Sequence, residues 1–359
     1  MMVIAFILLC YCCLVIMLWI GWQRLSRQTV PEATAEQMIT VVVAVRNEEK
    51  NITRLLNDLA AQQYSHFEVI AVNDHSSDAS AALLRASGLR NLVVLENEGN
   101  GKKHAITTGV KAAKGSVIVT TDADCSLPQQ WLRIINRYFQ REVVKFAFGG
   151  VRMQRDASFF SQLQAIEFAS LIGSGAATAA WGRPTMCNGA NLAYRKHAFE
   201  AVNGYEGNLH IASGDDEFLM RKIFDRYPDG VCFMASAEVV VGTQPQPDVA
   251  SFLQQRLRWA AKWKFNSSGY TISLALFILA SQLVSLWCLA SLVIDPSYPV
   301  LFLLVLKAVL EGFFLRHVCR FLKVHWRWPA LVLLQLLYPV YVVLVGVTSN
   351  FVSGTWKGR

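Results

Sequence analysis

The chain has 359 residues, 53% of them hydrophobic, and a formal net charge of +8. The apolar residues are concentrated towards the two ends, which excludes a wholly soluble protein. The net positive charge lies mostly beside the apolar runs, which favours anionic lipid over nucleic acid as its partner. Met1–Trp22 is uncharged and long enough to span a bilayer. We expect an N-terminal membrane anchor at residues 1–23, because no small-x-small cleavage site precedes Arg24.

Three further apolar runs predict a C-terminal transmembrane region over residues 268–355. They cover about residues 270–294, 298–315 and 329–351. Arg24 and Arg27 follow the first span, so the positive-inside rule predicts a multi-pass protein of the cell inner membrane with its central domain in the cytoplasm.

The later loops test that orientation. Asp295–Pro299 has no Lys or Arg and fits the outside, whereas the basic segment 316–328 fits the inside. The basic end Trp356–Arg359 would lie outside after four full spans. Either the last segment re-enters the membrane or its charge bias is too small to matter.

Residues 39–245 predict an α/β domain with a mainly parallel sheet, because strand-like runs alternate with helical patterns. Asn47 is expected to cap the helix after the first strand, and Pro128 to open the helix after the fourth. The expected strands are residues 40–45, 67–72, 91–95 and the run ending at Asp122.

Acids follow three of these strands: Glu48, Asp74 and the pair Asp122 and Asp124. Each alone could be a helix-start or turn residue. The carboxyl ends of parallel strands meet at one edge, so together they predict a pocket for a nucleotide diphosphate. The i, i+2 pair could hold a hard divalent cation, Mg²⁺ or Mn²⁺. Neither a Walker A motif nor GxGxxG is present.

Two lysines join this edge from the glycine-rich turn at residues 98–104. Lys102 and Lys103 are each expected to neutralise phosphate, although either alone could be a solvated surface charge.

A family resemblance extends over about residues 41–259, and its first five segments lie before residue 220. They are Val42–Glu48, Val72–Asp78, Thr121–Asp124, Asn188–Arg195 and Gly214–Leu219. In this order they resemble the GT-A nucleotide-sugar domain of family 2 glycosyltransferases. Gln255-Arg-Leu-Arg-Trp259 matches Q-x-x-R-W of hyaluronan, chitin and cellulose synthases and ceramide glucosyltransferases. The sequence departs from the family at Arg46 and at Gly214–Asp215.

The resemblance implies an inverting glycosyltransferase with Asp216 as general base, Asp215 being the alternative. Asp124, together with Asp122, would hold the metal, and Arg258 would add positive charge on the diphosphate. The substrate-binding residues that it implies are Ala44, Arg46, Glu48, Asp74, Lys102, Lys103, Asp122, Gly189, Asn191, Asp215, Gln255, Arg258 and Trp259.

Residues 246–266 predict an interfacial amphipathic helix, with Arg256 pointing away from its apolar side. Residues 159–171 fit a second such helix or core packing. We therefore expect transfer from a UDP-sugar to a membrane lipid. A processive polysaccharide synthase shares every motif, and a non-catalytic sugar-nucleotide sensor or transporter is a third class. Four spans are too few to enclose an exported chain unless the protein dimerises, and the sequence leaves the oligomeric state open.

Overall fold

The computed structural model describes residues 2–27, 29–30, 32–154, 156, 158–209, 211, 213–265 and 268–351. Its contacts divide the chain into two units that interleave along the sequence. The sheet unit comprises Arg24–Gln154 and Thr178–Gln244, and the helical unit comprises Met1–Gln23, Arg155–Ala177 and Pro245–Gly354. Residues 155–177 lie within the expected 39–245 domain but group with the helical unit.

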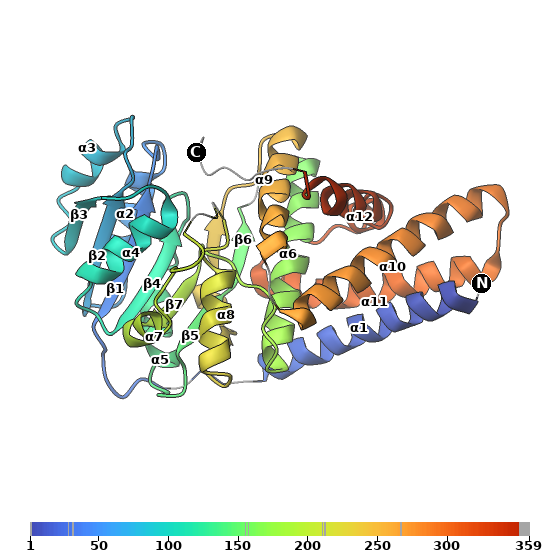
Figure 1. Ribbon diagram of the computed structural model, residues 1–359, viewed down its shortest axis with the longest axis horizontal. Coiled ribbons are helices and arrows are strands. Elements are labelled where there is room, and N and C mark those ends of the chain that lie inside the picture. Colours follow the sequence, from blue (N-terminus) through green and yellow to red (C-terminus); the bar gives the residue numbers. More distant parts are fainter. Residues whose placement is uncertain are drawn as a thin grey trace. The chain divides into compact units, whose positions relative to one another are not determined.

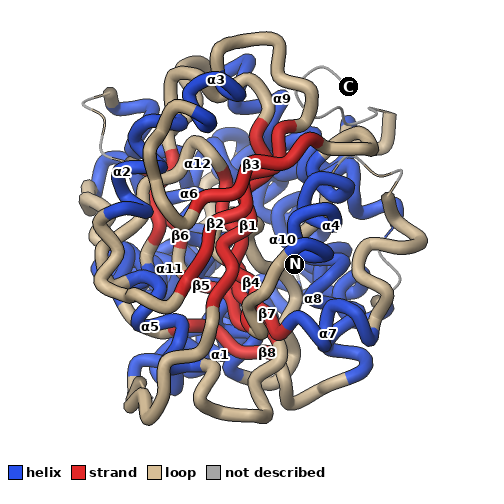
Figure 2. Tube along the Cα trace, turned by 90° about the vertical axis from the view of Figure 1, so that its left-hand side faces the viewer, coloured by secondary structure: helices blue, strands red, loops and turns tan. Residues whose placement is uncertain are grey.

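A seven-stranded, mostly parallel sheet forms the core of the sheet unit (Figure 2). Only β7 runs antiparallel to its neighbours within this sheet, which confirms the predicted fold class. In spatial order the strands are β3 (Leu92–Glu96), β2 (Phe67–Asn73), β1 (Ile39–Val45), β4 (Val117–Asp122), β7 (Leu192–Arg195), β5 (Phe146–Gly149) and β8 (Val231–Met234). Two short strands, β6 (Val151–Met153) and β9 (Val241–Thr243), pair separately.

The register of the central strands brings their carboxyl ends together. Ala44 pairs with Val72 on β2 and with Asp122 on β4, while Val45 pairs with Asn73. All seven residues of β1 are buried, as expected for a central strand covered on both faces. The loops after β1, β2 and β4 therefore leave the sheet at one edge, where ligands bind in open α/β folds.

Two helices of the sheet unit begin later than the sequence predicts. Asn47 is not a helix cap: it adopts a φ of 52°, and its Oδ1 accepts a hydrogen bond of 2.9 Å from the Ser77 backbone N–H. Pro128 likewise precedes its helix by a turn. The helices are α2 (Ile52–Ala60), α3 (Ser80–Arg85), α4 (Lys102–Ala112), α5 (Trp131–Tyr138), α7 (Lys196–Ala201) and α8 (Glu217–Arg226).

The helical unit contains four helices long and apolar enough to cross a membrane, as expected (Figure 1). They are α1 (Met2–Ser26), α10 (Gly269–Ile294), α11 (Tyr298–Leu322) and α12 (Trp328–Thr348). Helix α11 continues through Arg316 and Arg320, so the expected basic loop is partly helical. Trp356–Arg359 lies outside the described residues. Helices α6 (Phe159–Ala180) and α9 (Val249–Ala261) are the other long elements of this unit.

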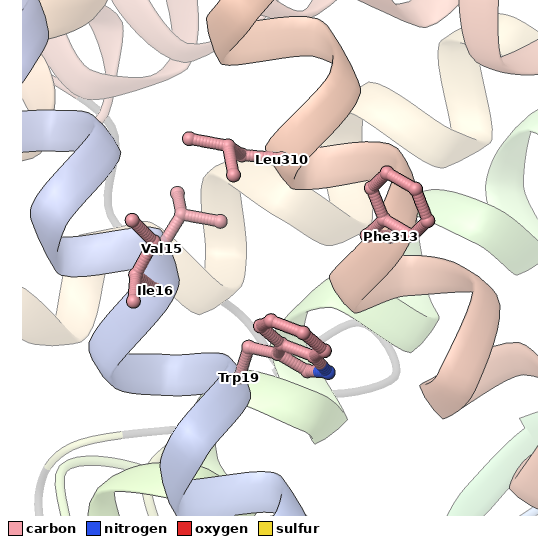
Figure 3. Close-up of a pocket in the computed structure, with 5 residues that line it drawn as sticks. All are labelled: Val15, Ile16, Trp19, Leu310 and Phe313. Atoms are coloured by element: carbon pink, nitrogen blue, oxygen red, sulfur yellow. The ribbon is translucent and has the colours of Figure 1, made fainter.

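Helices α1 and α11 also line a half-open apolar pocket of about 210 Å³ (Figure 3). Its walls are purely aliphatic and aromatic apart from one indole nitrogen. The lining residues are Val15, Ile16, Trp19, Leu310 and Phe313.

A polar cluster links three of the candidate membrane spans near their centres. The Tyr11 hydroxyl donates to Glu311 Oε1 at 2.6 Å, and Gln335 Nε2 donates to Glu311 Oε2 at 2.7 Å. Lys307 Nζ lies 3.0 Å from Glu311 Oε1, and the Lys307 side chain is only 4% exposed. Charged groups at this depth require such partners, because hydrocarbon cannot solvate them.

We expect Lys307→Met to destabilise the helical unit by about 3 kcal/mol, because Glu311 then stays buried without its cation. The matched control is Lys307→Met combined with Glu311→Gln, which removes the orphaned charge and should regain most of the loss. Thermal unfolding in detergent measures both. A single variant as stable as the wild type would show that the pair contributes nothing.

Candidate active site

Lys102 is the centre of the polar groups at the carboxyl edge of the sheet. It is the first residue of α4 and follows Gly101, whose φ of 89° is a left-handed conformation that suits glycine. Its Nζ lies 2.8 Å from Asp122 Oδ1 and 2.7 Å from Asp215 Oδ2. Three separate segments therefore meet at one ammonium group.

This contact changes the acidity of its members. Burial alone lowers the pKa of Lys102, but the charges and hydrogen bonds of Asp122 and Asp215 outweigh it and raise that pKa. Burial likewise opposes ionisation of Asp215, yet Lys102 holds the pKa of this carboxyl below its usual value. The ammonium and the Asp215 carboxylate are therefore both charged at neutral pH.

Asp216 caps α8 beside this cluster. Its Oδ1 accepts from the Glu217 N–H at 2.7 Å, and its Oδ2 accepts from the Gly189 N–H at 3.1 Å. A Cβ at Gly189 would lie 3.0 Å from Asp215 Oδ2 and 3.1 Å from Lys102 Nζ, so the position favours glycine. The predicted residues Gly189, Asp215 and Asp216 thus lie together.

Asp124 follows Asp122 across the turn after β4. One ligand atom each from Asp122, Asp124 and Cys125 lie within 4.8 Å of one another. Two carboxylates at this spacing fit a hard divalent cation. Burial, followed by the charges of Asp122 and Asp124, raises the pKa of the Cys125 thiol well above its ordinary value. Arg54 supports the turn by donating to the Asp124 carbonyl at 2.6 Å, a contact that the sequence did not indicate.

Asp74 is fully buried and shapes the turn before α4. Its carboxylate accepts from Asn97 Nδ2 at 2.5 Å and from the Gly101 N–H at 3.1 Å. Arg46 Nη1 lies 3.6 Å from Asp74 Oδ2 and donates to the Asp74 carbonyl at 3.2 Å. The departure from the family at Arg46 is thus a buried partner of Asp74, and both residues set the position of Lys102.

Gly214, the other departure, has a φ of 79°, and a Cβ there would meet the Phe218 ring at 2.5 Å. A threonine or glutamate at this position would be strained in this backbone. Glycine therefore permits the turn that delivers Asp215 to Lys102.

Four further predicted residues of the sheet unit lie outside the Lys102 cluster. Ala44 is buried in β1, and Glu48 is buried in the loop after it, where its carboxylate accepts from Asn51 Nδ2 at 2.8 Å. Lys103 Nζ donates to the carbonyls of Asn208 and Ile211 at 2.7 and 3.0 Å. Lys103 therefore also stabilises the backbone at Asn208 and Ile211.

Asn191 is the fourth, and it is fully buried. Its Nδ2 donates to the Gly150 and Val239 carbonyls at 2.9 and 2.7 Å, and its Oδ1 accepts from Trp131 Nε1 at 3.0 Å. These contacts hold Asn191 in the interior of the sheet unit, and its predicted contact with the sugar stays a prediction.

The Q-x-x-R-W residues Gln255, Arg258 and Trp259 are half-buried on α9 of the helical unit. Their place beside the donor pocket stays a prediction. The expectation for Arg256 is wrong: it does not point away from the apolar side but is 2% exposed and paired with Glu167. An amphipathic pattern assigns every charge to the polar face and cannot reveal a buried partner on a distant helix.

The family of this chain is identified by its similarity to known proteins. The family model described as glycosyl transferase family 2 matches residues 40–225, more than half of the chain. The chain belongs to glycosyltransferase family 2. It is 27% identical over 234 residues to the glycosyltransferase AglE of Haloferax volcanii, covering 61% of this chain and 71% of that protein.

It is also 27% identical over 247 residues to the poly-β-1,6-N-acetyl-D-glucosamine synthase of Staphylococcus aureus. That match covers 66% of this chain but only 58% of the synthase. Among solved structures, the mannosyltransferase PcManGT from Pyrobaculum calidifontis, in complex with GDP-Man and Mn²⁺, matches with a TM-score of 0.59 at 18% identity. The match covers 97% of this chain and 98% of that one, and it supports the fold.

We expect Lys102→Met to lower the free energy of unfolding by about 1–3 kcal/mol in metal-free buffer, because two carboxylates lose a charge-assisted hydrogen bond. Lys111→Met is the matched control, since Lys111 is exposed on the same helix. Thermal unfolding of the two variants side by side checks this. Equal melting temperatures would contradict the central role given to Lys102.

Proposed function

We propose that this family 2 glycosyltransferase transfers a sugar, with inversion, from a nucleotide-sugar donor to a membrane lipid at the cytoplasmic face of the inner membrane. One observation carries the proposal. Lys102, Asp122, Asp215 and Asp216 converge with Gly189 at the ligand edge of the sheet, in a chain with four candidate membrane spans.

The donor's diphosphate would lie beside Asp122 and Asp124. These carboxylates would hold Mg²⁺ or Mn²⁺, and the metal would stabilise negative charge on the leaving nucleotide. The Mn²⁺ and GDP-Man bound by the Pyrobaculum mannosyltransferase support a metal-dependent nucleotide-sugar reaction. We assign UDP as the nucleotide from the family resemblance. Lys102 would exchange part of its contact with Asp122 for phosphate oxygens.

Asp216 would act as the general base. Two backbone N–H groups fix its carboxylate, so it can accept a proton without reorganisation. An acceptor hydroxyl attacks the anomeric carbon from the face opposite the diphosphate, its proton passes to Asp216, and the bond to the nucleotide breaks. Arg258 would add positive charge on the diphosphate, and on the acceptor side Trp259 would form a wall.

A membrane lipid is the acceptor favoured by the small number of spans. Sugar cannot face hydrocarbon, so an exported chain needs a channel enclosed by protein. The similarity to the Staphylococcus synthase supports the second candidate, a processive polysaccharide synthase that elongates and exports its product. Four spans in one chain would then require a second copy to close the channel.

We expect Asp216→Asn to lower transfer by about 10²–10⁴-fold, the usual contribution of a general base, while nucleotide binding stays measurable. Asp215→Asn is the companion variant, because it removes a neighbouring carboxylate that already pairs with Lys102. Single-turnover kinetics of both variants check the assignment. Normal turnover by Asp216→Asn and loss in Asp215→Asn would move the base to Asp215.

The acceptor is tested with membranes containing the protein, a panel of labelled nucleotide sugars, and partition between chloroform and water. We expect label in the organic phase, lost in EDTA and restored by Mn²⁺ or Mg²⁺. Membranes carrying the Asp216→Asn variant are the control. Large water-soluble product would identify a processive synthase instead, and EDTA-resistant transfer would contradict the metal site.

A further inference from the structure

A buried ion pair lies on the α9 helix that carries the Q-x-x-R-W motif. Arg256 Nη2 donates to Glu167 Oε2 at 2.5 Å, and its Nε donates to Glu167 Oε1 at 3.2 Å. The two side chains are 2% and 4% exposed. This bidentate contact fixes both the distance and the rotation between α9 and α6.

Three aromatic rings surround the guanidinium group. Its central carbon lies 4.4 Å from the ring centre of Trp259, 4.5 Å from that of Phe252 and 5.9 Å from that of Phe168. Stacking and cation–π attraction suit arginine better than lysine. Burying two charges costs several kcal/mol each, and apolar side chains of similar volume would pack as stably. The ion pair therefore points to a geometric role rather than to stability.

Arg256 also contacts the motif directly. Its Nη1 donates to Gln255 Oε1 at 2.5 Å, and its guanidinium lies over the Trp259 ring. Arg256 therefore contacts both Gln255 and Trp259. Its own orientation is set by the two hydrogen bonds that it donates to Glu167.

A third group extends the contact to a membrane helix. The Tyr341 hydroxyl donates to Glu167 Oε1 at 3.3 Å, and the Tyr341 ring lies 5.7 Å from that of Phe252. Tyr341 belongs to α12, one of the candidate spans. The motif helix is therefore connected through Glu167 to a candidate membrane span.

We propose that Glu167, Arg256 and Tyr341 form a positioning latch that sets the rotation and depth of α9, so that Gln255 and Trp259 face the polar head of the lipid acceptor. This inference rests on the proposed function, since it assigns Gln255 and Trp259 to acceptor binding. None of the three latch residues takes part in the bond-forming step.

Arg256→Lys tests the latch because it keeps the charge but loses the fork geometry and the contact with Gln255. We expect the KM for the lipid acceptor to rise about tenfold or more, with the Kd for the nucleotide unchanged within about twofold. Tyr341→Phe, which removes one hydroxyl and keeps the ring, should shift the acceptor KM in the same direction by a smaller factor. Tyr270→Phe is the control, because Tyr270 is half exposed on α10.

Hydrogen exchange provides a readout independent of transfer. Amides of residues 249–261 should exchange faster in Arg256→Lys than in the wild type, while those of β1 and β4 stay unchanged. Folded Arg256→Lys and Tyr341→Phe variants with wild-type acceptor KM would overturn the latch alone. A wild-type protein that transfers sugar to no lipid would instead overturn the proposed acceptor, and with it the positioning role.

Discussion

Negative charge gathered at the ends of parallel strands must be balanced, and in this protein Lys102 balances it. The carboxylates of Asp122 and Asp215 come from separate segments, and neither could remain close to the other without the ammonium between them. The surrounding loops position Lys102 and Asp215 for this contact. Buried Asp74 fixes the turn before Lys102, and Gly214 allows the backbone that delivers Asp215. In the proposed reaction, the donor's phosphates would replace part of the contact between Lys102 and these carboxylates.

Much of this arrangement follows from patterns that the sequence carries locally. Short apolar runs ending in acids predict β1, β2 and β4, and the parallel register then gathers their loops at one edge. The length and composition of the apolar runs likewise predict the four candidate spans.

What the sequence could not provide depends on contacts between distant segments. Asn47 has the composition of a helix cap, but a hydrogen bond from the Ser77 N–H holds it in a left-handed conformation. Asn191 lies in a motif associated with the sugar pocket, yet its side-chain amide forms hydrogen bonds with three groups in the interior. Arg256 looks like a surface charge until Glu167 is found opposite it. In each case the partner lies at least 30 residues away, beyond any periodicity.

The buried pair on α9 also has a consequence for how the chain is made. Glu167 precedes Arg256 by 89 residues and Tyr341 by 174. During synthesis α6 therefore emerges with a carboxylate and aromatic side chains whose partners on α9 and α12 have not yet been made. A ribosome that stops before α9 would leave this face open to other chains or to chaperones. The order of translation thus makes the last third of the protein responsible for completing a helix from its middle.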